Sequence, residues 1–182
     1  ELDLLQHREA DLAGGALAQL ALGRVRRPGR ALVRVFNPDP ARDGFHSSHT
    51  VIMVVTDDMP FLVDSLGIVC SQSGLAVHLL AHPVFSVRRD RSGRLRELRL
   101  DGSVGARAES WQLIHVDREP DAGRLAELER HIRRTLDDVR VATADWRRMR
   151  AKAREAAVLL DASRVRGQQH ELHEARALLE WM

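Results

Sequence analysis

The residues most able to do chemistry lie where an apolar run meets a predicted helix. Residues 50–66 read TVIMVVTDDMPFLVDSL, so two acids and a proline directly follow a strand-like segment. The corner comprises Asp57, Asp58, Met59, Pro60 and Phe61. Its carboxylates could bind the ammonium group of a small ligand, and Pro60 could shape the pocket. The alternative is helix capping, because acids near a first turn offset unsatisfied N–H groups and stabilise by about 0.5–2 kcal/mol.

Five histidines fall on or beside predicted strands and raise a second hypothesis, a metal site. They are His46, His49, His78, His82 and His115. Zinc needs three or four convergent ligands with supporting hydrogen bonds, and no cysteine or carboxylate spacing accompanies these histidines. The pattern therefore favours half-buried histidines on a sheet surface or at an interface, and we expect no metal.

Six arginines crowd a predicted hairpin, and such a basic cluster can bind nucleic acid. They are Arg88, Arg89, Arg91, Arg94, Arg96 and Arg99. Nucleic-acid binding domains usually add a recognition fold and stacking aromatic residues. Aromatic residues make up only 4% of this chain, and neighbouring acids dilute the cluster. The sequence therefore favours a solvated or domain-docking hairpin and no nucleic-acid partner.

Composition narrows the class of protein. The 182 residues, 44% of them hydrophobic, are enough for one packed core with a helical appendage. No run of about 18 apolar residues predicts a membrane span, and no apolar segment near Glu1 predicts a secretory signal. Cys70 is the only cysteine, which excludes an intrachain disulfide and favours a buried, inert thiol. We expect a cytoplasmic protein, and the mid-helical pattern at Met182 suggests part of a longer polypeptide.

Hydrophobic periodicity predicts a mixed α+β chain. The predicted strands are 31–36, 50–56, 75–89, 94–100 and 109–117, and the predicted helices are 1–23, 60–73, two within 123–167 and one from about Gln168. The continuously apolar strand 50–56 should be central, and Pro83 marks an edge or a bulge. A short strand at Val139–Val141 is the alternative to continuous helix there. The order favours one antiparallel sheet with helices on one face, in a ferredoxin-like βαββαβ core with helical extensions at both ends.

Five blocks carry a family resemblance. They are LVRVFNPDP at 32–40, HTVIMVVTDDMPFLVDSL at 49–66, LAVHLLAHPVFSVRRD at 75–90, ESWQLIHVDRE at 109–119 and DVRVATADWRRMR at 138–150. Together they resemble the amino-terminal region of the large bacterial NAD-dependent glutamate dehydrogenases, over about 32–160 of this chain. In that family the region is similar to ACT domains, which are regulatory modules, and the catalytic domain lies far downstream.

The resemblance implies a non-catalytic regulatory or oligomerisation domain. The parent enzyme would oxidatively deaminate L-glutamate to 2-oxoglutarate, with NAD bound elsewhere, since no G-x-G-x-x-G follows a strand here. The expected partners are other domains of the parent enzyme and further copies of the chain in a homo-oligomer. The expected organisation is an N-terminal helix and linker at 1–30, an ACT-like domain at 31–144 and a helical extension at 145–182.

An amino-acid sensor is the alternative that the resemblance implies. ACT modules often bind an amino acid between the first strand and the first helix, where D-x-P-G-x-L is the usual pattern. Asp57, Met59, Pro60 and Leu62 stand at equivalent places, and Phe61 replaces the glycine. Glycine lets a ligand reach main-chain N–H groups at a helix N-terminus, so we expect phenylalanine to block that approach. The implied effector-binding residues are those of the corner, 57–61.

Overall fold

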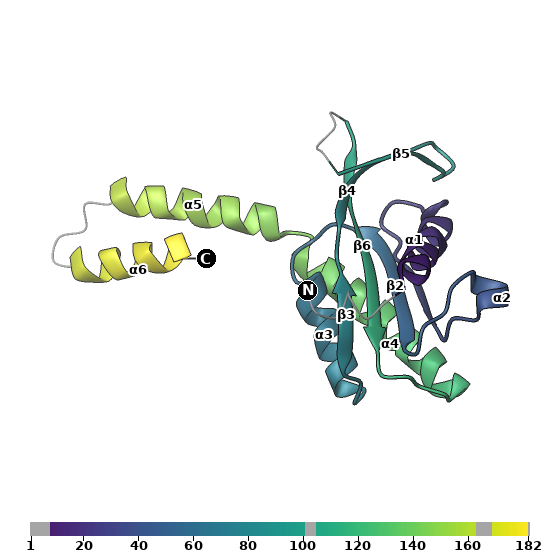
Figure 1. Ribbon diagram of the computed structural model, residues 1–182. Coiled ribbons are helices and arrows are strands. Elements are labelled where there is room, and N and C mark those ends of the chain that lie inside the picture. The colour runs from purple at the N-terminus through teal and green to yellow at the C-terminus, as the bar shows by residue number, and fades with distance from the viewer. Residues whose placement is uncertain (1–7, 101–104, 163–168, 182) are drawn as a thin grey trace. The chain divides into compact units, whose positions relative to one another are not determined.

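The computed structural model describes residues 8–100, 105–162 and 169–181, and it confirms the α+β class (Figure 1). The strands of the described part are β1 (Leu32–Phe36), β2 (Thr50–Asp57), β3 (Val77–Ala81), β4 (Val84–Arg89), β5 (Leu95–Arg99) and β6 (Arg107–Val116). The helices are α1 (Glu9–Gly23), α2 (Pro40–Asp43), α3 (Leu62–Gln72), α4 (Ala122–Thr143), α5 (Trp146–Ala162) and α6 (Gln169–Trp181). The expected elements are therefore present, and α2 is a short helix inside a predicted loop.

All the strand pairs of the sheet are antiparallel, and β2 and β6 lie at its centre. The strand order is β1-β2-β6-β4-β5, and β3 also pairs with β6. Strands β3 and β4 follow each other along the same side of β6 and are interrupted at His82 and Pro83. Proline has no N–H to donate to a ladder, so this is the irregularity that Pro83 predicted.

The topology has the split β-α-β arrangement of a ferredoxin-like sheet, because β6 lies between β2 and the β3–β4 line. The strand on the other side of β2 is β1, which precedes β2 in the chain instead of following α4. Val139–Val141, left open as strand or helix, belongs to α4. The N-terminal part of the chain therefore supplies the edge strand that a βαββαβ order would place last.

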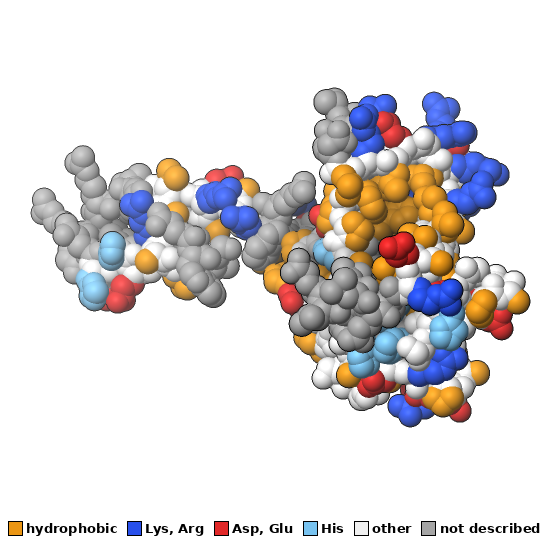
Figure 2. Space-filling model, viewed as in Figure 1, with side chains coloured by type: hydrophobic (Ala, Val, Ile, Leu, Met, Phe, Trp, Pro, Cys, Tyr) orange, Lys and Arg blue, Asp and Glu red, His pale blue; other side chains and the backbone are white. Residues whose placement is uncertain are grey.

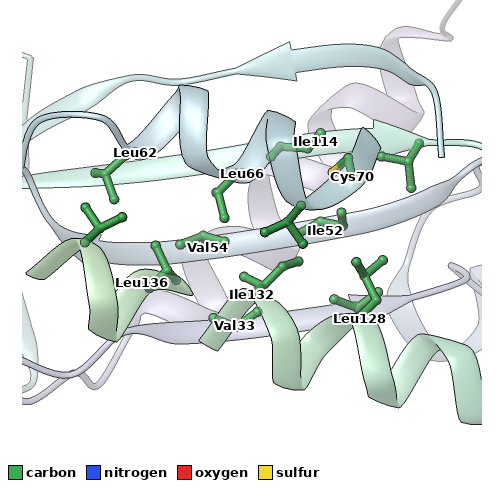
Figure 3. Close-up of a cluster of buried hydrophobic side chains, with 14 residues drawn as sticks. Val33, Ile52, Val54, Leu62, Leu66, Cys70, Ile114, Leu128, Ile132 and Leu136 are labelled. Atoms are coloured by element: carbon green, nitrogen blue, oxygen red, sulfur yellow. The ribbon is translucent and has the colours of Figure 1, made fainter. Parts of the chain in front are cut away.

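The main core lies between one face of the sheet and the helices α3 and α4 (Figure 3). Ile52 and Ile114 from the central strands meet Leu66 of α3 and Ile132 of α4, and each is at most 1% exposed. Burying a side chain of this size stabilises the fold by about 1.5–3 kcal/mol. The three- and four-residue spacing of Leu128, Ile132, Leu136 and Val139 aligns one apolar stripe of α4 with the sheet.

The other face of the sheet is covered by α1. Ala18 and Leu22 of that helix pack against a second cluster that includes Met53 of β2 and Leu113 of β6. Gly23 makes the approach close, since a Cβ there would lie 2.2 Å from the Trp111 ring. The N-terminal helix is thus part of the layered fold, whereas the sequence suggested an extension beside helices on a single face. The reason is that β2 is apolar on both faces and needs cover on both.

The chain divides into two compact units, Glu1–Val139 and Arg140–Met182. In the second unit α5 and α6 pack against each other. The finer division expected from the sequence, with boundaries after residues 30 and 144, stays a prediction. Within the described residues, no helix has the length and apolar character needed to cross a membrane.

Candidate functional site

The corner between β2 and α3 contains a strained residue. Phe61 has φ 66° and ψ 10°, and it is the one non-glycine residue with positive φ in the described part of the chain. This left-handed conformation costs an L-residue about 1–2 kcal/mol and often marks functional positions. The Phe61 side chain is 56% exposed. The backbone therefore keeps a glycine-type conformation, and the side chain there is a largely exposed aromatic ring.

The N-cap residue of α3 is Phe61, and it makes no side-chain capping hydrogen bond. Neither Asp57 nor Asp58 occupies the N-cap position, and the contribution of their charges to the helix dipole stays a prediction. One oxygen of Asp57 lies 2.6 Å from Nη2 of Arg26, and the other accepts a hydrogen bond from the Gly29 N–H at 2.9 Å. The side chain of Asp58 is exposed, and the main-chain N–H of Asp58 donates to the carbonyl of Ala108. The carboxylate that could have held a ligand ammonium group thus binds a guanidinium of its own chain.

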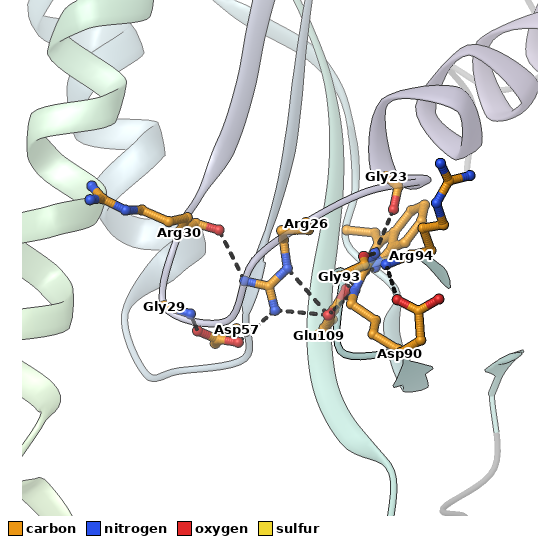
Figure 4. Close-up of polar contacts among 11 residues, drawn as sticks. Gly23, Arg26, Gly29, Arg30, Asp57, Asp90, Gly93, Arg94 and Glu109 are labelled. Atoms are coloured by element: carbon orange, nitrogen blue, oxygen red, sulfur yellow. Dashed lines mark hydrogen bonds and ion pairs between the residues drawn. The ribbon is translucent and has the colours of Figure 1, made fainter. Parts of the chain in front are cut away.

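A second carboxylate stands beside Asp57. Glu109 of β6 is its partner in the antiparallel register, and two like charges in that position repel each other. Arg26 compensates, with Nη2 2.8 Å from Oε1 of Glu109 (Figure 4). Arg89 binds both Glu109 oxygens at 2.8 Å. The Trp111 indole N–H donates to the same carboxylate. We call Arg26, Asp57, Arg89 and Glu109 the arginine–carboxylate clamp.

The two central side chains of the clamp, Arg26 and Glu109, are buried and charged, and Asp57 is 33% exposed. The side chains of Arg26 and Glu109 are each 1% exposed. Burial alone would raise the pKa of Glu109, but hydrogen bonds from Arg89 and Arg26 and their positive charges bring it below its usual value. Burial alone would lower the pKa of Arg26, and the bonds to Asp57 and Glu109 raise it instead. Groups locked in these charge states are poor acids and bases, so the clamp suits structure better than proton transfer.

The clamp joins segments that are distant in the sequence. Arg89 donates from Nη1 to the carbonyl of Gly23, at the end of α1, and to that of Gly93, in the β4–β5 turn. Arg26 donates from Nη1 to the carbonyl of Arg30. The connector after α1, the hairpin and the ends of β2 and β6 are therefore held at one point, next to the corner.

The five histidines that were considered as metal ligands are brought together only in part. The rings of His49 and His78 stack with centroids 4.4 Å apart, and His115 lies 6.0 Å from His49. Nε2 of His78 is 2.7 Å from a carboxylate oxygen of Asp117. The remaining two, His46 and His82, take no part in these ring contacts. In the described residues no group of three or more His, Cys, Asp or Glu side chains could hold a metal ion.

The arginine cluster of the hairpin is largely paired with acids. Arg89 lies in the clamp, Arg88 and Arg99 flank Glu97, and Arg96 lies 2.8 Å from Asp90. These pairs weaken the positive field that a nucleic-acid surface needs.

Cys70 is buried in α3, and burial raises the pKa of its thiol.

Sequence reasoning found Asp57 and missed its partners. Arg26 lies in the predicted linker, and Arg89 lies in a hairpin expected to be solvated or to dock a domain. Glu109 is the first residue of a predicted strand, and nothing in the pattern indicates that its side chain is buried. One signal was present: a charged residue that begins or ends a continuously buried strand needs an opposite charge nearby. The partner's identity depends on the pairing of β2 with β6, which periodicity does not give.

The two sides of the sheet differ in how their edges are protected. On β1, the Val33 carbonyl accepts from Arg133 at 2.6 Å and the Val35 N–H donates to Glu129 at 3.1 Å, so α4 closes this edge. Among the described residues, β3 pairs with β6 on one side and has no strand neighbour on the other. Val77 and Leu80 of β3 are 41% and 37% exposed. An open strand edge with exposed apolar side chains is a surface on which another strand can pair.

Comparisons with known proteins agree on one family. The chain matches the family model described as the ACT1 domain of glutamate dehydrogenase over residues 1–132. It is 38% identical over 182 residues to an NAD-specific glutamate dehydrogenase from Pseudomonas aeruginosa, covering 99% of this chain and 11% of the relative. It is 36% identical over 183 residues to one from Halomonas elongata, with the same coverage. A third, from Mycobacterium tuberculosis, is 32% identical over 130 residues, 69% of this chain and 8% of the relative. The chain therefore spans about a tenth of the length of these relatives.

Proposed function

Because the chain belongs to the glutamate dehydrogenase ACT1 domain family, we propose that it is a non-catalytic assembly domain of a large NAD-dependent glutamate dehydrogenase. In this proposal the oxidative deamination of L-glutamate, and the binding of NAD, belong to other regions of the parent enzyme. The domain joins copies of the enzyme through its sheet. A cytoplasmic location is part of the proposal and can be checked by cell fractionation.

The open edge of β3 is the observation that supports assembly. Side chains of α4 bond two outer main-chain groups of β1, whereas β3 has a strand neighbour on one side alone among the described residues. β5 also has a single strand neighbour there, but its charged side chains oppose pairing. A second copy could add its own β3 there, with main-chain hydrogen bonds for affinity and Val77 and Leu80 buried between the two sheets. In a two-fold arrangement each β3 would serve as both donor and acceptor, which closes the assembly at a dimer.

The test is the solution mass of this 182-residue chain by sedimentation velocity. We expect a dimer, and we expect Leu80→Lys to give monomer because a lysine on a strand edge opposes pairing. Leu100→Lys is the matched control, since Leu100 is 78% exposed and lies outside β3. A chain that is monomeric at every concentration would count against assembly through this edge.

Amino-acid sensing is a second candidate function, favoured by the strained backbone at Phe61. An effector's ammonium group at Asp57 would compete with the guanidinium of Arg26. Effector binding would then loosen the arginine–carboxylate clamp and be transmitted to α1 and to the β4–β5 hairpin. The proposed binding residues remain Asp57, Asp58, Met59, Pro60 and Phe61.

A thermal-shift screen of the twenty amino acids tests this candidate on two proteins, the unmodified chain and Phe61→Gly. If the ring limits access to the helix N-terminus, the glycine variant should respond more strongly to the same amino acid. No response from either protein would remove the sensor hypothesis and leave assembly as the function.

A further inference from the structure

We propose that a groove between α1 and the start of β5 binds an acidic amphipathic helix from another region of the parent polypeptide. The proposal rests on the proposed function in one respect: it requires that this chain be a domain of a longer enzyme. It concerns a different surface from the β3 edge.

The groove has an apolar floor. It encloses about 530 Å³ and is lined by Leu17, Leu20, Ala21, Arg24, Val25, Arg94, Leu95 and Arg96. Leu17, Leu20 and Val25 are 65%, 39% and 50% exposed. In Figure 2 hydrophobic side chains gather below the β4–β5 hairpin, with basic side chains at the margin. An apolar patch with a polar rim commonly marks a binding surface.

The exposed leucines follow from the pattern of α1. Its inner side packs on the sheet through Ala18 and Leu22, while Leu17, Leu20 and Ala21 recur at helical spacing on the side that lines the groove. A helix that is apolar on both sides is typical of one covered on both sides. The sheet covers one of these sides, so the other is the side that a partner would cover.

The charges of the groove select the partner. Arg24, Arg94 and Arg96 line it. In the part of the chain that the structure describes, Arg96 has an acidic partner, Asp90, at 2.8 Å, and neither Arg24 nor Arg94 lies in ion-pair range of a carboxylate. Two copies meeting through this groove would bring arginines face to face, which is unfavourable. An amphipathic helix with leucines on one face and carboxylates beside them matches both the floor and the rim.

The length of the relatives indicates where the helix comes from. The chain spans 11% of the Pseudomonas aeruginosa enzyme, so in such a protein most of the surface that can reach the groove belongs to the same polypeptide. A tethered helix is present at an effective concentration in the millimolar range for short flexible linkers, so a small groove is enough to hold it.

The test uses the full-length enzyme with a photo-cross-linking amino acid in place of Leu17, followed by mass spectrometry of the cross-linked peptides. We expect an intramolecular cross-link to an acidic, amphipathic segment. The double variant Arg24→Glu/Arg94→Glu should lower the yield about tenfold, because two favourable charge contacts become repulsive. Arg27→Glu/Arg91→Glu is the matched control, since both arginines are exposed and neither lines the groove. Its yield should stay unchanged.

Three results would overturn the inference: no cross-link from position 17, a cross-link to a basic segment or to a second enzyme molecule, or a yield that the groove charges do not change. Thermal unfolding of each variant verifies that the enzyme remains folded. Failure of the assembly proposal would be seen separately, because an intramolecular cross-link needs no second copy. A cross-linked but monomeric enzyme would refute assembly alone.

Discussion

Glu109 is the residue on which most of the polar contacts near the corner depend. It accepts hydrogen bonds from Arg26, Arg89 and Trp111 while being 1% exposed. Glu109→Gln leaves two buried guanidinium groups with too little negative charge, and breaking a buried pair in this way costs about 3–5 kcal/mol. Urea unfolding measures the loss. Glu97→Gln, which removes a partly exposed partner of Arg88 and Arg99, should cost less than about 1 kcal/mol. Equal losses for the two variants would contradict a special role for the clamp.

The same carboxylate makes stability depend on pH. The folded-state pKa of Glu109 lies below its usual 4.5, so its contribution to the free energy of unfolding is present above pH 4.5 and is lost as the pH falls through the folded-state pKa. Asp43, held at a pKa of about 2 by Arg42, the Asp39 main chain and Arg34, adds to the loss in acid. Unfolding curves between pH 7 and pH 2 should therefore show falling stability, with a smaller fall in Glu109→Gln. A profile that the substitution leaves unchanged would show that Glu109 is not ionised in the clamp.

Phe61 carries a backbone cost that glycine would remove. The free energy of unfolding of Phe61→Gly should exceed that of Phe61→Ala by about 1 kcal/mol. Both variants lose the ring, and only glycine adopts φ 66° without strain. Thermal or urea unfolding of the pair isolates the backbone effect from loss of the ring. If alanine proved as stable as glycine, the left-handed conformation at this position would be in question.

Sequence reasoning at this scale located the corner and missed its chemistry. Asp57 and Phe61 were identifiable because a buried strand stops there and a helix begins. The use of Asp57 by Arg26 was not identifiable, because the two residues are 31 positions apart and meet only when α1 docks on the sheet.

At the scale of the elements, the assembly proposal depends on how the edges of the sheet are closed. Arg133 of α4 donates to the Val33 carbonyl at 2.6 Å and pairs with Glu129, which accepts from the Val35 N–H. Arg133→Ala should lower the free energy of unfolding by about 1 kcal/mol through loss of a charged hydrogen bond. It should also speed hydrogen exchange at the amide of Val35. Arg134→Ala, one position along the same helix and exposed, is the control and should change neither. If the Val35 amide exchanged as slowly in Arg133→Ala as in the unmodified chain, Arg133 would not be needed to hold Glu129 against this edge.

The elements themselves were largely readable from the sequence. Periodicity and continuous apolar runs predicted most of the strands and the long helices of the described residues. The sequence predicted a single strand over 75–89 with an edge or a bulge at Pro83, and the structure has two strands there, β3 and β4. The placement of α1 was not predicted, because Gly14 and Gly15 weaken its apparent helical pattern. In the structure a Cβ at Gly14 would lie 2.5 Å from the Phe45 side chain, so small residues let the helix approach the segment it covers.

The first unit, Glu1–Val139, is a ferredoxin-like layer structure in which an early strand takes one edge and α1 covers the second face. Among the described residues α4 closes one edge and β3 has a strand neighbour on one side alone, which is why we propose a role in assembly. Periodicity predicted the fold class because each layer has its own pattern. It predicted that residues 31–36 form a strand but not that this strand lies beside β2 at the edge, because periodicity does not give the order of strands in a sheet.

The solution mass of the full-length enzyme, measured with Leu80→Lys and with the control Leu100→Lys, tests the assembly role most directly. We predict that the lysine on β3 reduces the mass of the assembled enzyme to that of a smaller oligomer, while the control keeps the mass of the unmodified protein. An enzyme whose mass is the same in all three forms would contradict the proposal that this domain joins copies through β3.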